Sequence, residues 1–156
     1  MLKFLISSLF VFSISVFAQT IDLDATIQKS YKTDKIPLIF LHRVGCSYCN
    51  SMEEFTFDDD DVKNFINKHF HFVSINVTTD HDILFEKQHM EGLDFAKEVG
   101  YNFYPSVLFL DKDGEILYAS VGYKEEKEFL LILEYIQTRS YKTLSFDQYK
   151  HKKMDR

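Results

Sequence analysis

The chain has 156 residues and a mass of 18.5 kDa, which is ample for one hydrophobic core and short for two domains. Hydrophobic residues make up 46% and charged residues 27%, which excludes wholesale disorder and a protein with several membrane spans. The formal net charge of -6 argues against nucleic acid as a partner, because binding a phosphate backbone requires a basic face.

Residues 1–18 are predicted to be a secretion signal. Lys3 precedes an apolar run, and the run ends at Ala18 in a Val-Phe-Ala sequence that a signal peptidase can cleave. The run is shorter than the ~20 apolar residues that span a bilayer, and it contains four serines. We therefore expect cleavage near Ala18, no stable membrane insertion of the mature protein, and a periplasmic location. That compartment is oxidising, so two cysteines can form a disulfide there.

One domain is predicted over residues 19–138. Helical spacing over 21–32 predicts a leading helix, and the apolar run Leu38–Leu41 predicts a strand that is buried on both faces. The composition after Cys46 favours a helix that begins at this cysteine. The elements expected further along the chain are a helix after Asp58–Asp61, a strand over Phe70–Val77, a polar segment over 78–92, a helix from Leu93 to Gly100, a hairpin of Val107–Leu110 and Ile116–Val121, and a helix over Phe129–Ile136. This order predicts an α/β fold with a central mixed β-sheet flanked by helices on both faces.

Residues 139–156 differ from the domain in charge. They carry six basic and two acidic side chains, a net of +4, whereas residues 19–138 carry a net of -11. We expect a basic C-terminal tail that is solvated and partly disordered. Contact with an anionic partner is the alternative.

The two cysteines, Cys46 and Cys49, are the residues most informative about function. A disulfide that closes so short a loop stabilises a fold by roughly 2 kcal/mol, less than the about 3 kcal/mol of a fifteen-residue loop. A thiol at a helix start faces free backbone N–H groups and the positive end of the helix dipole, and both favour the thiolate. We therefore predict that Cys46 is the nucleophile and that Cys49 resolves the mixed disulfide.

Other uses of the cysteine pair remain open. Structural zinc takes four ligands, which two cysteines and scattered histidines supply poorly. Two thiolates with His42 could instead hold Cu(I), which would make the chain a binding protein. A buried, inert pair in an interaction module is the third alternative.

The chain resembles the thioredoxin-fold family, and most closely its secreted thioredoxin-related (SoxW-like) branch. The resemblance spans about residues 30–136, and its matching segments are Pro37 with the strand Leu38–Leu41, the motif Gly45-Cys46-Ser47-Tyr48-Cys49, Thr78-Thr79-Asp80, Tyr104-Pro105-Ser106 before Val107–Leu110, and the turn Asp113-Gly114. The resemblance implies that Pro105 is a cis proline lying against Cys46. It also implies a substrate groove formed by Tyr104, Pro105, Ser47 and Tyr48, in which the Tyr104 backbone pairs with an extended segment of the partner.

Two of the departures from thioredoxin bear on the chemistry of the cysteine pair. Phe40 stands where thioredoxin has a buried aspartate that deprotonates the second cysteine, so Glu53 or a water would have to accept that proton. Ser47 and Tyr48 replace the Gly-Pro of thioredoxin and the Pro-His of strong oxidants. We therefore expect a reduction potential between these extremes and nearer the reducing side.

The sequence thus predicts a periplasmic thiol-disulfide oxidoreductase that acts through Cys46 and Cys49, more as a reductant than as an oxidant. We expect a monomer without cofactor or metal. Its partners would be protein thiols and disulfides and a protein that recharges the pair. A disulfide oxidase or isomerase is the alternative within this class, and a Cu(I)-binding or redox-inactive module is the alternative outside it.

Overall fold

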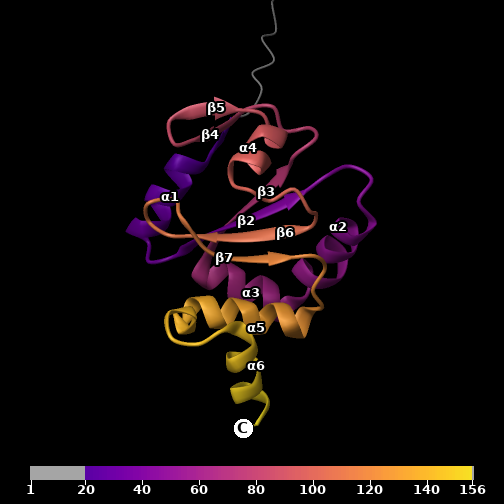
Figure 1. Ribbon diagram of the computed structural model, residues 1–156, viewed down its shortest axis with the longest axis vertical. Helices are drawn as coiled ribbons and strands as arrows, with labels where there is room; N and C mark the ends of the chain where they lie inside the picture. The colour runs from indigo at the N-terminus through magenta and orange to yellow at the C-terminus, as the bar shows by residue number, and fades with distance from the viewer. Residues whose placement is uncertain (1–19, 156) are drawn as a thin grey trace, which may run out of the picture.

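The computed structural model describes residues 20–155 (Figure 1), so the predicted secretion signal lies outside the described residues. In that part of the chain, no helix combines the length and the apolar character needed to cross a membrane. The elements, in chain order, are β1 (Ile21–Asp22), α1 (Leu23–Lys32), β2 (Ile36–His42), α2 (Ser47–Ser51), the π-helical segment η1 (Met52–Phe57), α3 (Asp60–His69), β3 (Phe70–Asn76), β4 (Ile83–Phe85), β5 (Gln88–Met90), α4 (Gly92–Glu98), β6 (Ser106–Leu110), β7 (Ile116–Val121), α5 (Glu126–Gln137), the 3₁₀ turn η2 (Ser140–Lys142) and α6 (Phe146–Met154).

The main sheet has four strands in the order β3-β2-β6-β7. Strand β2 runs parallel to β3 and antiparallel to β6, and β6 and β7 form an antiparallel hairpin. The five residues Pro37–Leu41 of β2 are all buried, as expected for a central strand covered on both faces. The predicted α/β fold with a mixed sheet is confirmed.

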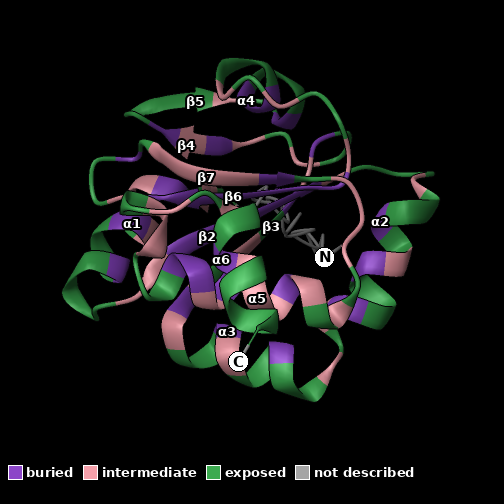
Figure 2. Ribbon diagram, turned by 60° about the horizontal axis from the view of Figure 1, so that its bottom comes forward, coloured by how far each residue is buried: buried purple, intermediate pink, exposed green. Residues whose placement is uncertain are grey.

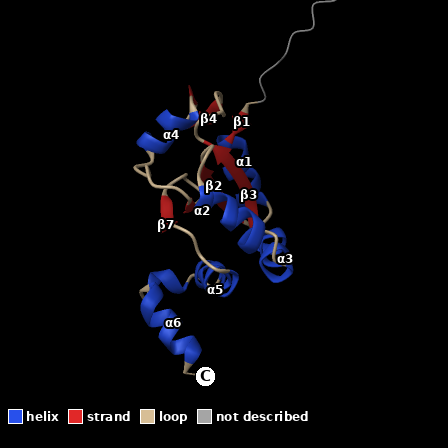
Figure 3. Cartoon of the chain, turned by 90° about the vertical axis from the view of Figure 1, so that its right-hand side faces the viewer, coloured by secondary structure: helices blue, strands red, loops and turns tan. Residues whose placement is uncertain are grey.

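Alternation along β2 divides the core into two halves. Leu38 and Phe40 face the half that is covered by α3 and α5, whereas Ile39 and Leu41 face the half that is covered by α1 and α4. Figure 2 shows the buried residues on the inner sides of these helices, and Figure 3 shows the sheet between the two helical layers. Helices therefore cover both faces of the sheet, and only the ends of its strands are left for a functional site.

Sequence reasoning missed a second, smaller sheet. Residues 78–92 contain the hairpin of β4 and β5, and β1 pairs with β4 in the order β1-β4-β5. The hairpin turn uses Glu86 and Lys87 in the left-handed region, with φ of 50° and 63°, where a glycine or asparagine is the usual signal. The Asp24 carboxylate accepts hydrogen bonds from both turn amides, at 2.9 and 2.8 Å. A residue of α1 thus stabilises a turn that the sequence of the turn itself does not predict.

The basic tail is more ordered than its composition suggested. The Ser145 hydroxyl accepts a hydrogen bond from the Gln148 amide at the start of α6, and the Gln148 side-chain oxygen accepts one from the Ser145 amide, which completes a capping box. Tyr149 is buried against α5, where its ring lies 5.3 Å from that of Tyr135. In this structure residues 140–155 thus contain η2 and α6, two elements that composition did not predict.

Charge explains part of this order. Lys150 Nζ lies 3.1 Å from Glu128, and Lys153 Nζ lies 2.6 Å from Glu134. Both glutamates belong to α5, so the acidic domain attracts the basic tail. The Tyr135 hydroxyl also donates a hydrogen bond to the Leu144 carbonyl at 2.7 Å, which fixes the connection between the two helices.

Candidate functional site

The cysteine pair lies where β2 passes into α2. The strand ends at His42, a short exposed loop follows, and Gly45 turns the chain with a φ of 75°. Cys46 is the N-cap of α2, and its Sγ accepts a hydrogen bond from the Cys49 amide at 3.2 Å. The predicted helix start at the first cysteine is confirmed, and the Cys46 sulfur faces the free N–H groups of that helix.

The two sulfurs form a disulfide but differ in accessibility. The Sγ atoms of Cys46 and Cys49 are 2.03 Å apart, and the Cα atoms are 5.2 Å apart. Cys49 is fully buried in the core half beneath α3 and α5, whereas Cys46 is only partly buried. An incoming sulfur can therefore approach Cys46 and is kept from Cys49.

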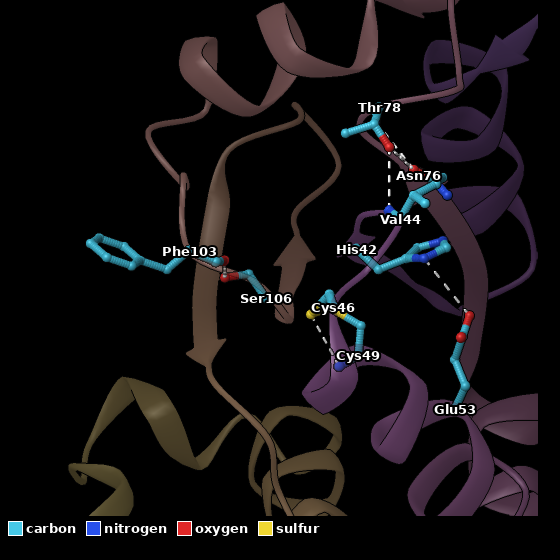
Figure 4. The surroundings of a disulfide bond; sticks show 9 residues. All are labelled: His42, Val44, Cys46, Cys49, Glu53, Asn76, Thr78, Phe103 and Ser106. Carbon is cyan, nitrogen blue, oxygen red and sulfur yellow. Dashed lines mark hydrogen bonds and ion pairs between the residues drawn. A yellow bond between two sulfur atoms is a disulfide. The ribbon is translucent and has the colours of Figure 1, made fainter.

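The chain before β6 brings a second predicted site segment to the same end of the sheet. The Tyr104–Pro105 peptide bond is cis, as the resemblance implied. Ser106, the next residue, pairs with Leu41 near the end of β2, and its hydroxyl donates a hydrogen bond to the Phe103 carbonyl at 2.6 Å. Figure 4 draws Phe103 and Ser106 on one side of the disulfide. Pro105 is buried and Tyr104 is half-buried.

Large apolar side chains are exposed on the two segments that meet at this end of the sheet. Val44 is 66% exposed, Tyr48 is 66% exposed, and Phe103 is 76% exposed. Val44 and Tyr48 flank Cys46 in sequence, and Phe103 precedes the cis peptide. We call these three residues the apolar rim. Exposed apolar surface of this kind is typical of a site that binds another molecule. Ser47, also a predicted groove residue, is exposed between the cysteines.

The segment after β3 holds the loop that precedes Cys46. Thr78 Oγ1 accepts a hydrogen bond from the Val44 amide at 3.3 Å and donates one to Asn76 Oδ1 at 2.8 Å. The Asp80 carboxylate in turn accepts a hydrogen bond from the Asn76 amide at 2.7 Å. Sequence reasoning did not predict this bracing role for Thr78. Its only signal was the Thr78-Thr79-Asp80 segment.

Aromatic packing occupies the position of the missing aspartate. Phe40 is fully buried, and its ring stacks on the His42 imidazole with 5.0 Å between centroids. His42 Nε2 lies 3.0 Å from Ser74 Oγ, and its Nδ1 lies 3.9 Å from Glu53 Oε1. Figure 4 shows His42 and Glu53 together on the side of the disulfide away from Phe103. Two titratable groups on this side of the disulfide are thus an imidazole and a carboxylate that is nearly half exposed.

The surroundings of the disulfide offer little to a metal ion. His42, the third ligand of the Cu(I) alternative, directs its two nitrogens at Ser74 and Glu53. Over residues 20–155, no three histidine, cysteine or acidic side chains gather into a set that could hold a metal.

Burial raises the pKa of Tyr104, against a smaller opposing effect of Arg43, so its hydroxyl stays neutral at physiological pH.

Comparison with known proteins agrees with this geometry. A model of the thioredoxin-like domain family matches residues 23–137. The chain belongs to that family. Its thioredoxin-like domain has a C-x-x-C cysteine pair at the start of α2, an arrangement consistent with thiol-disulfide exchange.

Solved structures show the same fold. A thioredoxin-fold protein from Helicobacter pylori is 25% identical, with a TM-score of 0.63 over 76% of this chain and 80% of that one. A thioredoxin from Thermus thermophilus is 20% identical, with a TM-score of 0.60 over 77% and 88%. The oxidised DsbD C-terminal domain from Neisseria meningitidis is 19% identical, with a TM-score of 0.55 over 77% and 98%. A comparison with curated protein sequences finds no significant match.

Proposed function

We propose that this protein is a thiol-disulfide oxidoreductase of the secreted thioredoxin-related branch, which reduces disulfides of protein partners in the periplasm. The observation that carries this proposal is the unequal burial of the two sulfurs at a helix start. Cys46 is partly exposed and Cys49 is fully buried. This is the asymmetry that a nucleophile and a resolving cysteine require.

The reaction begins with the reduced pair. The Cys46 thiolate attacks one sulfur of a partner disulfide, so that a Cys46–partner disulfide forms and the other partner sulfur leaves as a thiolate. Cys49 then loses its proton and attacks Cys46 Sγ, which forms the Cys46–Cys49 disulfide and releases the second partner thiolate. Two electrons have passed to the partner. The structure contains the oxidised pair, which is the product of this sequence.

The chain's own residues support both steps. The Cys49 amide donates to Cys46 Sγ in the present state, and the same N–H would stabilise the thiolate after reduction. The apolar rim of Val44, Tyr48 and Phe103 offers a contact surface for a protein partner. Tyr104 lies two residues before Ser106, which pairs with Leu41 near the end of β2, and this position supports the proposal that an extended partner segment pairs with the Tyr104 backbone.

Insulin-disulfide reduction tests the proposal. The wild-type protein should catalyse it, and Cys46→Ser should abolish it because the attacking sulfur is gone. Cys49→Ser should accumulate a mixed disulfide with the partner, visible by mass spectrometry. Asn50→Ser is the matched control, since it changes an exposed neighbour of Cys49 and should keep full activity. Equal turnover by the wild type and Cys46→Ser would refute the proposal.

The direction of exchange is tested by the reduction potential of the Cys46–Cys49 couple in glutathione buffers. Thioredoxin lies at about -270 mV and a strong oxidant at about -120 mV. We expect a value nearer the first, because Ser47-Tyr48 lacks the histidine of strong oxidants. A value near the second would instead identify an oxidase.

A further inference from the structure

A hollow lies at the end of the sheet opposite the disulfide. Its volume is about 860 Å³, within the range of ligand pockets. It is lined by the first residues of β2, the last of β6 and the chain that follows α5. In Figure 1 these parts lie on the left, whereas α2 lies on the right. Strand β2 runs the whole way between the two sites, so they are on the order of 20 Å apart.

The rim of this hollow is basic although the chain is acidic. Four cations line it against the two lining carboxylates Asp34 and Asp111, and Asp113 pairs with one of the cations. The net charge here is still positive, in a chain whose formal charge is -6. The four cations are Lys35, Lys112, Arg139 and Lys142. They come from three separate connections, so the charge accumulates only in the folded state.

Two of the cations are held in place and two are available. Lys35 Nζ donates to the Asn67 carbonyl at 2.6 Å, and Lys112 pairs with Asp113 at 2.5 Å. Among residues 20–155, neither Arg139 nor Lys142 forms an ion pair. A guanidinium and an ammonium free of internal partners are suited to binding carboxylates.

The local potential also acts on a neighbouring histidine. Partial burial and the positive charges of Lys68 and Lys35 lower the pKa of His69, which lines the hollow. The carboxylates Asp34 and Asp111 share the lining but do not reverse this effect. Attraction of a negatively charged ligand rests on the four cations of the rim and not on this pKa.

The interior of the hollow is apolar and aromatic. Ile27, Pro37 and Leu110 are buried in its lining, and the Tyr31 ring at its mouth is 70% exposed. Tyr141 adds a second, half-buried ring. A ligand that matches both the basic rim and this floor carries carboxylates beside a large apolar side chain.

We propose that this hollow is a docking site for an acidic peptide segment of a partner protein, with an apolar side chain on the floor and carboxylates on Arg139 and Lys142. The site does not depend on the chemistry of the cysteines. A partner held there and at the disulfide together would bind at a raised effective concentration.

Fluorescence anisotropy tests this with a labelled peptide in which a leucine and a phenylalanine lie among four glutamates. The peptide should bind, and binding should weaken as salt rises. Peptides with lysine for glutamate, or with alanine for the two apolar residues, should bind at least roughly tenfold more weakly. Absence of binding, or equal binding of the three peptides, would overturn the proposal. Full competition by inorganic phosphate would also overturn it, because it would indicate a site for small anions.

Paired variants locate the site. The double substitution R139E/K142E should weaken binding roughly tenfold or more, whereas the charge-matched K127E/K152E, at exposed lysines outside the hollow, should change it little. Insulin reduction should be the same in all three proteins, which separates this proposal from the redox function. In the wild type, amide shifts on peptide addition should cluster at 34–36, 110–112 and 139–142. Clustering around Cys46 would contradict the proposal. This measurement uses the wild type, so it does not depend on whether the variants fold.

Discussion

Phe40 is the residue whose identity changes the site most. The resemblance to thioredoxin implies a buried aspartate at this position, whereas here a ring packs between His42, Phe57 and Phe72. The position therefore contributes packing rather than a proton acceptor. In the proposed reaction, the proton of Cys49 would go to solvent or toward the side where His42 and Glu53 lie.

Phe40→Ala should lower the free energy of unfolding by about 3–5 kcal/mol, because it leaves a cavity in a fully buried cluster. Urea denaturation measures this. Phe72→Ala is the matched control, since it removes an exposed ring of the same cluster and should cost much less. Similar losses in the two variants would contradict the assignment of Phe40 to the core.

His71 makes stability depend on pH. Its Nδ1 lies 2.7 Å from Ser30 Oγ, and burial together with Lys35 and Lys29 lowers its pKa below 6.5. The folded protein then binds this proton less readily than the unfolded chain does. The free energy of unfolding should therefore fall as the pH drops below about 6.5, and the fall should stop below the lowered pKa of the folded state.

Urea unfolding on both sides of pH 6.5 measures this slope. His71→Gln should flatten it, whereas His81→Gln, at an exposed position in the segment before β4, should leave it unchanged. The lowered pKa of His69 acts in the same direction, so some slope remains in the first variant. An unaltered slope in His71→Gln would show that another group is responsible.

At the scale of elements, capping and periodicity made most of the fold predictable. Asp59 caps α3 by accepting hydrogen bonds from the amides of Asp61 and Val62, both at 3.0 Å, as the acidic run indicated. The β4–β5 hairpin escaped prediction because its strands are three residues long and its turn relies on Asp24, 62 residues away from Glu86. A turn stabilised by a distant side chain has no local sequence signal.

Helix α4 approaches the backbone of the chain after β3 closely. A Cβ on Gly92 would lie 2.7 Å from the Val77 Cα, and the Gly92 amide donates to the Asp80 carbonyl at 2.8 Å. Gly92→Ala should therefore lower the free energy of unfolding by about 1–3 kcal/mol, through displacement of α4. Thermal unfolding tests it, with the exposed Leu93→Ala as the control that should change little. A fully stable Gly92→Ala would mean that α4 can shift without cost.

At the scale of the whole molecule, the tail completes the fold. Helix α6 covers α5 through Tyr149, and its lysines neutralise glutamates of the acidic domain. Tyr149→Ala should lower the free energy of unfolding by about 3 kcal/mol, whereas Met154→Ala, at an exposed position of the same helix, should be near neutral. Denaturation measures both. Insulin reduction by folded Tyr149→Ala should stay at the wild-type rate. Equal stability of Tyr149→Ala and Met154→Ala would mean that α6 does not pack on the domain in solution.

The sequence by itself determined the strands of the main sheet, most of its covering helices and the position of the cysteine pair. Apolar periodicity, the buried run of β2 and the position of Cys46 and Cys49 after it are local features, and local features specify helices, strands and the chemistry at a helix start. The cis state of the bond before Pro105 was implied only by resemblance. Only the tertiary structure decided which sulfur is exposed, how Thr78 braces the loop, and how Lys35, Lys112 and Arg139 gather into one basic rim. These properties depend on residues far apart in the chain, whose approach is set by packing rather than by any pattern of neighbours.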